Sequence, residues 1–575
     1  MKRKLLPLAL LTGLLAGLAS SGLMAQAKPA TIIPKNPIFT MHIDGPAALR
    51  AAFLPTNLGK MFAGPEFKDM IAPVNQMIES GKEELGGELP FDLNEIEKAL
   101  YGYRGRISAA LHLLDEAIDF TANEPPAFTV TIVLTPDGKT DLAALCKKSQ
   151  EFVKEKMGEA LEEMEVGGKT ISYFHDEDDH APGLSVPFMH KDQAVILITK
   201  DFKKAAEAIV AEDAEHHSRD KAYASASLGV SINVKKITQL LSQAASDSMG
   251  PEWDDIGAHI LKGSGVLSID SVDMTYRAKG PALLSQAVIN FNQNSRGVIG
   301  AFFQAQSAKS SLIAMLPRGA MSAGAMPFDL KTAYKSVKAI FESMGDAAPM
   351  AFDDLEEQFK EHFGLRLFED LIGLFGGNIM TIQMETDEVN ISNPLGMLDG
   401  MCFGFDVSDG AKMGKTIDTM LRKDGLHAGR KKKEYKGFTV YDLTIAAMLE
   451  LHYAVTDNLL LLGIGGAGGD AVRAGLDEAK NRADGQDPVA LPNSISNRLN
   501  MVSSGYTGLG WSNVQAQFES LVSQLDALAG TLPPEFDMFI EMLDKMPPLL
   551  KNYGVKHQIA VIRTSGNRWV HEIIW

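Results

Sequence analysis

Cysteine is nearly missing from this chain, with only Cys146 and Cys402 among 575 residues. Two cysteines cannot build a disulfide framework, so the fold has to be stabilised by a hydrophobic core. Cys146 lies in a helical pattern of apolar residues and Cys402 in a strand-like one. Both are therefore predicted to be buried thiols rather than reactive or metal-binding ones.

Positive charge is also scarce, because 55 Lys and Arg face 73 Asp and Glu, for a net charge of −18. An acidic surface repels nucleic-acid phosphates and anionic lipid headgroups, which excludes nucleic acid as a partner class. Catalytic signatures are missing as well: the sequence has no G-x-S-x-G elbow, no H-E-x-x-H helix and no G-x-x-x-x-G-K-[ST] loop. These absences favour a non-enzymatic protein.

Long apolar runs occur only at the N-terminus. A basic head at residues 2–4 precedes the apolar run Leu5–Leu18, and Ala25-Gln26-Ala27 offers an A-x-A cleavage site. This pattern predicts a signal peptide over residues 1–27 and a periplasmic or secreted mature protein that starts at Lys28. The alternative is an N-terminal anchor that stays uncleaved. No later stretch reaches about 18 apolar residues, so we expect no transmembrane span after cleavage.

The two halves of the chain resemble each other. Pro251-Glu252-Trp253-Asp254 is similar to Pro534-Glu535-Phe536-Asp537, and just upstream of each a strand, an Asn-Val pair and a helix follow one another. Such long-range similarity indicates a duplicated folding unit. We therefore predict an α+β fold of two tandem homologous units, residues 28–303 and 304–575. Each is expected to be a mostly antiparallel sheet with amphipathic helices packed on one face.

The densest group of metal-binding residue types is His175-Asp176-Glu177-Asp178-Asp179-His180. Carboxylates suit calcium and imidazoles suit zinc. The spacing is not that of a calcium loop, and the corresponding segment of the second half carries nothing comparable. Two interpretations stay open: a solvated acidic loop, or a weak calcium or zinc site. The ligands of that metal site would be His175, Asp176, Asp178, Asp179 and His180.

Two further motifs have both a structural and a functional interpretation. Gly463-Ile464-Gly465-Gly466-Ala467-Gly468 matches the dinucleotide-binding pattern G-x-G-x-x-G. It follows a hairpin strand and its counterpart Thr199–Phe202 has no glycine, so we predict a structural strand-to-helix turn. Arg430-Lys431-Lys432-Lys433 is a basic island. It is predicted to be a solvated loop, or else a docking site for an acidic or phosphate-bearing surface.

The pattern resembles a group of exported bacterial proteins described as a domain of unknown function. In the first half the resemblance lies in Leu100-Tyr101-Gly102, the strand Thr129–Val133, the strand Gly168–Tyr173 and the hairpin at Asp192. In the second half it lies in Leu374-Phe375-Gly376, Tyr435-Lys436-Gly437-Phe438 and Asp457. The resemblance implies an envelope or secreted protein and provides no catalytic residues.

Together these features predict an exported, non-enzymatic binding or scaffolding protein of the bacterial envelope. Its partner would be an envelope or extracellular ligand or protein. The alternative, from a different class, is a secreted metal-assisted hydrolase that uses the His175–His180 loop with Glu177 as the base.

Overall fold

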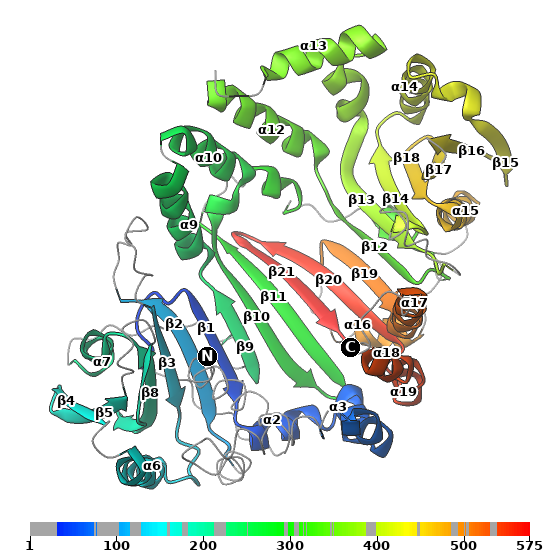
Figure 1. Cartoon of the computed structure of the whole chain (residues 1–575). Helices are drawn as coiled ribbons and strands as arrows, with labels where there is room; N and C mark the ends of the chain where they lie inside the picture. Colours follow the sequence, from blue (N-terminus) through cyan, green and yellow to red (C-terminus); the bar gives the residue numbers. More distant parts are fainter. Residues whose placement is uncertain are drawn as a thin grey trace. The chain divides into compact units, whose positions relative to one another are not determined.

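The computed structural model (Figure 1) describes most of the chain after the predicted signal peptide. The described residues are 32–73, 76, 103–114, 128–157, 161–174, 182–211, 223, 226–249, 251–292, 297–303, 310–313, 315–317, 319–345, 348, 350–386, 398–445, 449–484, 493–499, 501, 505–528 and 537–575. Packing divides the chain into two compact units. Unit 1 is Met1–Gly250 with Asp270–Val288, and unit 2 is Pro251–Ile269 with Ile289–Trp575.

Unit 1 is built on an antiparallel sheet with the order β10-β9-β1-β2-β3-β8. Beyond β8, the short strands β6 and β7 both pair with it, β5 pairs with β6, and β4 pairs with β5. The strands are β1 (Phe39–Asp44), β2 (Arg106–Leu113), β3 (Phe128–Leu134), β4 (Glu162–Val166), β5 (Lys169–Phe174), β6 (Gly183–Ser185), β7 (Phe188–His190), β8 (Gln193–Thr199), β9 (Leu228–Ile232), β10 (Ile269–Lys279) and β11 (Ala282–Phe291). The helices are α2 (Pro46–Phe53), α3 (Asn57–Ala63), α6 (Leu142–Met157), α7 (Phe202–Val210) and α9 (Val234–Met249).

Unit 2 is also built on an antiparallel sheet, with the order β21-β20-β19-β12-β13-β14-β18-β17-β16-β15. The strands are β12 (Ser322–Pro327), β13 (Phe375–Gln383), β14 (Met401–Val407), β15 (Lys431–Tyr435), β16 (Phe438–Ile445), β17 (Leu449–Val455), β18 (Leu459–Ile464), β19 (Gly508–Asn513), β20 (His557–Ser565) and β21 (Arg568–Ile574). The helices are α10 (Pro251–Ser264), α11 (Ser310–Ile313), α12 (Leu330–Met344), α13 (Phe352–Phe363), α14 (Gly410–Lys423), α15 (Gly466–Ala483), α16 (Asn493–Leu499), α17 (Val514–Leu528), α18 (Asp537–Asp544) and α19 (Met546–Asn552).

The predicted α+β class with a mostly antiparallel sheet is confirmed. Strands and helices also follow one another in a corresponding order in the two units, so that β4 and β5 correspond to β15 and β16, and α7 corresponds to α15. By contacts, Pro251–Ile269 packs with unit 2. The domain boundary between residues 303 and 304 rests on the sequence repeat rather than on packing, and it stays a prediction.

The prediction that helices cover one face of each sheet is wrong. In unit 1, α6 packs Leu142 and Cys146 against Ile132 of β3, whereas the cluster around α7 contains the next strand residue, Val133. Adjacent residues of a strand point to opposite faces, so α6 and α7 lie on opposite faces of the sheet.

Unit 2 repeats this arrangement. Met413 of α14 packs against Leu460 of β18, and Val472 of α15 shares a cluster with the neighbouring Leu461. The sequence hid this feature because the central strands are apolar on both sides. A continuous run such as Leu459–Leu462 does not reveal whether one face or both faces are covered.

The repeated sequence motifs have a local structural reason. Asn233, which follows β9, accepts a hydrogen bond from the backbone N–H of Lys236 at 3.0 Å, and Asn513, the last residue of β19, accepts one from the N–H of Ala516 at 3.2 Å. Each Asn thereby binds an N–H of the first helical turn, which has no partner within the helix. The repeated Asn-Val pair thus starts the helix after this strand in both units.

The hairpin turns are similarly constrained. The turn between β4 and β5 contains Gly167 and Gly168 at φ 55° and 70°, and the turn between β15 and β16 contains Lys436 and Gly437 at φ 49° and 91°. Two consecutive positive φ angles are typical of tight two-residue hairpins and favour glycine. The predicted hairpin at Lys191–Gln193 is also confirmed, since His190 pairs with Gln193.

Unit 1 buries a charged pair. Arg106 at the start of β2 donates to Asp44 Oδ1 at the end of β1, at 2.9 Å from Nε and 2.7 Å from a terminal nitrogen, and also to the carbonyl of Ala226. Only 1% of the Arg106 surface is exposed. Burial raises the pKa of Asp44, an effect that the neighbouring guanidinium opposes. Since a buried charge is costly without its partner, each side chain requires the other.

A buried histidine lies further along β2. His112 is 4% exposed, and neither ring nitrogen has a hydrogen-bond partner among the described residues. Burial without a partner disfavours the charged imidazolium. It lowers the pKa of His112 to about 4.

Candidate functional site

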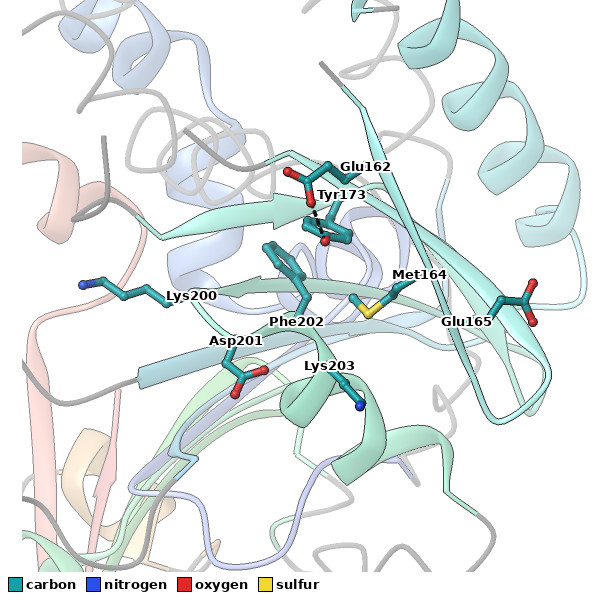
Figure 2. Close-up of a pocket in the computed structure, with 8 residues that line it drawn as sticks. All are labelled: Glu162, Met164, Glu165, Tyr173, Lys200, Asp201, Phe202 and Lys203. Carbon is teal, nitrogen blue, oxygen red and sulfur yellow. Dashed lines mark hydrogen bonds between the residues drawn. The ribbon is translucent and has the colours of Figure 1, made fainter. Parts of the chain in front are cut away.

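A surface pocket of about 400 Å³ lies in unit 1, between the β4–β5 hairpin and the start of α7 (Figure 2). It is lined by three apolar or aromatic side chains and five charged ones. The lining residues are Glu162, Met164, Glu165, Tyr173, Lys200, Asp201, Phe202 and Lys203.

Two stacked aromatic rings form the apolar part of this pocket. The ring centroids of Tyr173 and Phe202 are 4.3 Å apart with an interplanar angle of 27°. Phe202 is the first residue of α7, which begins there because Asp201 accepts a hydrogen bond from the N–H of Lys204 at 3.0 Å. Gly183 lets β6 approach the ring, because a Cβ at Gly183 would lie 2.7 Å from a ring carbon of Phe202. Local backbone geometry therefore fixes the ring.

The polar part of the pocket is centred on a tyrosine–carboxylate pair. The Tyr173 hydroxyl donates to Glu162 Oε2 at 2.6 Å, directly across the β4–β5 ladder. This hydrogen bond, together with burial and the negative charge of Glu162, raises the pKa of Tyr173 to about 12. Tyr173 is therefore a neutral donor at physiological pH, and it holds the Glu162 carboxylate against the edge of the aromatic pair.

The charged side chains around the pocket differ in direction. Figure 2 shows Lys200 extending away from the two rings, and Glu165 on the far side of the hairpin from Glu162. Three carboxylates and two ammonium groups line the pocket, which leaves a net negative charge. An aromatic face beside a fixed carboxylate attracts organic cations, through cation–π attraction and ion pairing.

The five predicted metal ligands, His175, Asp176, Asp178, Asp179 and His180, lie outside the described residues. They follow Phe174, the last residue of β5, so in the sequence they adjoin Tyr173 of the pocket. Within the part of the chain that the structure describes, no group of three or more His, Cys, Asp or Glu side chains is arranged to hold a metal ion. The calcium or zinc site stays a prediction.

The glycine-rich segment forms the predicted turn from β18 into α15. Gly465 has φ 73°, and its N–H donates to the carbonyl of Glu450 on the neighbouring strand β17. Asp399 Oδ1 accepts from the N–H of Ala467 at 3.3 Å, in the first turn of the helix. The chain's own carboxylate thus occupies the place where a dinucleotide phosphate would bind.

The prediction that Arg430–Lys433 is a loop is wrong. Lys431–Tyr435 form strand β15, in which all three lysines are exposed. Arg430 precedes the strand, bonds Asp418 at 2.7 Å and the Tyr453 hydroxyl at 2.9 Å, and lies over the Tyr441 ring. Three consecutive lysines have a low intrinsic preference for a strand and therefore suggest a loop. Pairing with β16 overrides this preference.

The prediction of two buried thiols is confirmed for Cys146 and Cys402. The sequence interpretation missed the pocket. The sequence does contain a sign of the pocket, which is a difference between the two corresponding hairpins. Glu162 and Tyr173 face each other in β4–β5, whereas the corresponding residues of β15–β16 are Lys431 and Asp442. Asp442 is already engaged by Lys433 at 2.6 Å and by His452 at 2.7 Å. The corresponding ladder position of the β15–β16 hairpin thus has no tyrosine–carboxylate pair.

Comparison with known proteins gives little to set beside this geometry. No protein-family model and no curated protein matches the chain. Crystal form III of TP0453 aligns over 47% of this chain and 83% of its own, with 9% identity and a TM-score of 0.20. Crystal form IV aligns over 46% and 81%, with 10% identity and a TM-score of 0.21. At these scores we base no argument on the similarity.

Proposed function

We propose that this chain is an exported, non-enzymatic binding protein of the bacterial envelope, and that the pocket of unit 1 is its ligand site. The observation that carries this proposal is the stacked Tyr173–Phe202 pair beside the Glu162 carboxylate. An apolar surface with a few fixed polar groups is typical of small-ligand sites. The N-terminus supports export, because it has a basic head, then an apolar run, then an A-x-A site.

The proposal includes descent of the two units from one duplicated unit. The corresponding order of helices and strands and the matching Asn caps of α9 and α17 support it. Among the described residues, no helix has both the length and the apolar character needed to cross a bilayer.

The chemistry of the pocket favours a ligand with an aromatic or apolar body and one cationic group. The body would lie against Met164 and the aromatic pair, which are the apolar lining residues. The cation would lie beside Glu162, whose position is fixed by the Tyr173 hydroxyl. Because the pocket is open to solvent, the charge contributes selectivity more than affinity.

Three phenyl compounds of similar size test this proposal: phenethylamine, 2-phenylethanol and phenylacetate. Titration of the mature protein should give a roughly millimolar Kd for phenethylamine, as expected for so few atoms. The neutral and anionic compounds should bind about tenfold more weakly or worse. Equal affinity for all three, or no binding of the amine, would contradict the proposal.

A matched pair of variants locates the binding. Glu162→Gln should remove the preference for the amine. Glu356→Gln should leave it unchanged, although Glu356 likewise accepts a hydrogen bond from a tyrosine hydroxyl, that of Tyr334 in unit 2. If both variants bind the amine as the wild type does, the pocket is not the site.

A further inference from the structure

The outermost strand of each sheet carries opposite charge. Strand β4 has the sequence EEMEV, with Glu162, Glu163 and Glu165 exposed, and β15 has the sequence KKKEY, with Lys431, Lys432 and Lys433 exposed. The two strands occupy corresponding places, each as the first strand of a hairpin at the end of its own sheet (Figure 1). The two corresponding edge strands therefore carry charges of opposite sign.

Within the part of the chain that the structure describes, β4 and β15 are both edge strands. Each strand pairs on one side with its hairpin partner, and no other strand among the described residues pairs with either. An edge strand with unpaired N–H and C=O groups is a template for adding another strand. Charged side chains normally prevent this addition, because like edges repel each other. In this chain, two β4 edges repel each other and two β15 edges repel each other, but a β4 edge and a β15 edge carry opposite charges and do not.

A register exists in which every facing pair is compatible. When β4 and β15 run antiparallel with Glu163 opposite Lys432, Glu162 faces Lys433 and Met164 faces Lys431. Glu165 then faces Arg430, at the start of the basic strand. Facing residues of an antiparallel pair lie on the same face of the sheet and interact directly, and opposite charges there are stabilising. A two-residue shift that places Glu165 opposite Lys432 instead places Glu163 opposite Glu434, so charge disfavours a shift in that direction.

The geometry points to self-association: β4 of one copy of this chain adds to β15 of a second copy. The contact is heterologous, because two different surfaces meet, and each copy retains one acidic and one basic edge. Association by such a contact continues from copy to copy, into a ring or an open chain. The edge contact shares Glu162, Met164 and Glu165 with the lining of the ligand pocket, so the test has to separate the two roles.

The contact is small, so the association should be weak and sensitive to salt. Two strands of five residues bury far less area than a stable dimer needs. Screening reduces the Debye length from about 10 Å at 0.1 M salt to about 3 Å at 1 M. Sedimentation velocity of the mature protein at up to about 1 mM should show a weight-average mass that rises with concentration at low salt and returns to the monomer value at 1 M salt.

Charge reversal gives the decisive test. The variant Glu163→Lys/Glu165→Lys has two basic edges, and the variant Lys431→Glu/Lys432→Glu has two acidic edges. Each should be monomeric alone, and an equimolar mixture should recover the association of the wild type. A control variant, Lys147→Glu/Lys360→Glu, matches the charge change of the acidic variant on the exposed surfaces of α6 and α13 and should associate normally.

The outcomes separate clearly. A wild type that stays monomeric to 1 mM overturns the inference, as does a mixture that stays monomeric while circular dichroism shows both variants folded. Association that the control variant also loses reflects net charge and overturns it too. Lys431→Glu/Lys432→Glu leaves every lining residue of the pocket unchanged, so phenethylamine binding measured on that variant distinguishes failure of the edge contact from failure of the pocket.

Discussion

Buried His112 should make unit 1 sensitive to mild acid. Its pKa is about 4 in the folded chain, against 6.5 for an exposed imidazole. Between these two values the unfolded chain binds a proton that the folded chain excludes. The stabilisation is therefore complete above pH 6.5 and is lost progressively as the pH falls towards 4.

The magnitude follows from the difference between the two pKa values. Each pKa unit corresponds to about 1.4 kcal/mol, so moving from pH 7 to 4.5 should cost unit 1 about 2.5 kcal/mol through this residue alone. His112→Leu replaces the ring with an apolar side chain of similar size that binds no proton. The pH dependence of the free energy of unfolding should become shallower by this amount.

The distribution of tryptophan makes the measurement selective. All four tryptophans, Trp253, Trp511, Trp569 and Trp575, belong to unit 2. Fluorescence therefore follows unit 2, whereas far-UV circular dichroism follows both units. The effect of His112→Leu should appear in urea titrations followed by circular dichroism, with the fluorescence transition unchanged.

A histidine of unit 2 provides the control. Burial also lowers the pKa of His557 to about 4, and its ring centroid is 6.4 Å from that of Trp511. His557→Leu should change the pH dependence of the fluorescence transition instead. If the wild type and His112→Leu lose the same stability between pH 7 and 4.5, the assignment of acid sensitivity to His112 is wrong.

Three further predictions concern the folded chain and its metal content. In a urea titration, Gly465→Ala should lower the free energy of unfolding of unit 2 by about 2 kcal/mol or more, because alanine is strained at φ 73° and its Cβ would lie 2.0 Å from Asp399 Oδ1. Gly466→Ala is the control, since a Cβ at Gly466 would have only one atom within 4 Å. Arg106→Met should cost unit 1 about 3–5 kcal/mol because Asp44 keeps a buried charge, whereas Lys147→Met, which breaks an exposed ion pair at 3.8 Å, should cost less than about 1 kcal/mol by circular dichroism. Elemental analysis of the mature protein should detect stoichiometric calcium or zinc, lost in His175→Ala/His180→Ala, only if the metal-site interpretation of the acidic segment is right.

The sequence allowed the element types and most hairpins to be predicted, because their signals are local. Lys191-Asp192-Gln193 between two apolar runs has the composition of a turn, and the repeated Asn-Val pairs start helices. Fold class follows from such signals. The placement of helices on both faces does not, because the apolar runs of β8 and β18 fit either arrangement.

The pocket could not be predicted because its residues come from separate elements. Glu162 and Tyr173 are brought together by a ladder register, and Phe202 joins them through the start of α7. Individually these are an exposed acid and two ordinary aromatic residues. For Lys431–Lys433, composition suggested a loop, and pairing with β16 decided otherwise.

At the start of α15, the carboxylate of Asp399 accepts the backbone hydrogen bond that a nucleotide phosphate accepts in a nucleotide-binding motif. Because the acid is tethered to the same chain, its effective concentration at the helix end is on the order of millimolar, so a dissolved phosphate would have to compete with it. A free anion would have to displace a competitor that never diffuses away, and would meet like-charge repulsion as it did so. The glycines allow the backbone to pass close to itself, and in this structure the Asp399 carboxylate lies at the helix end.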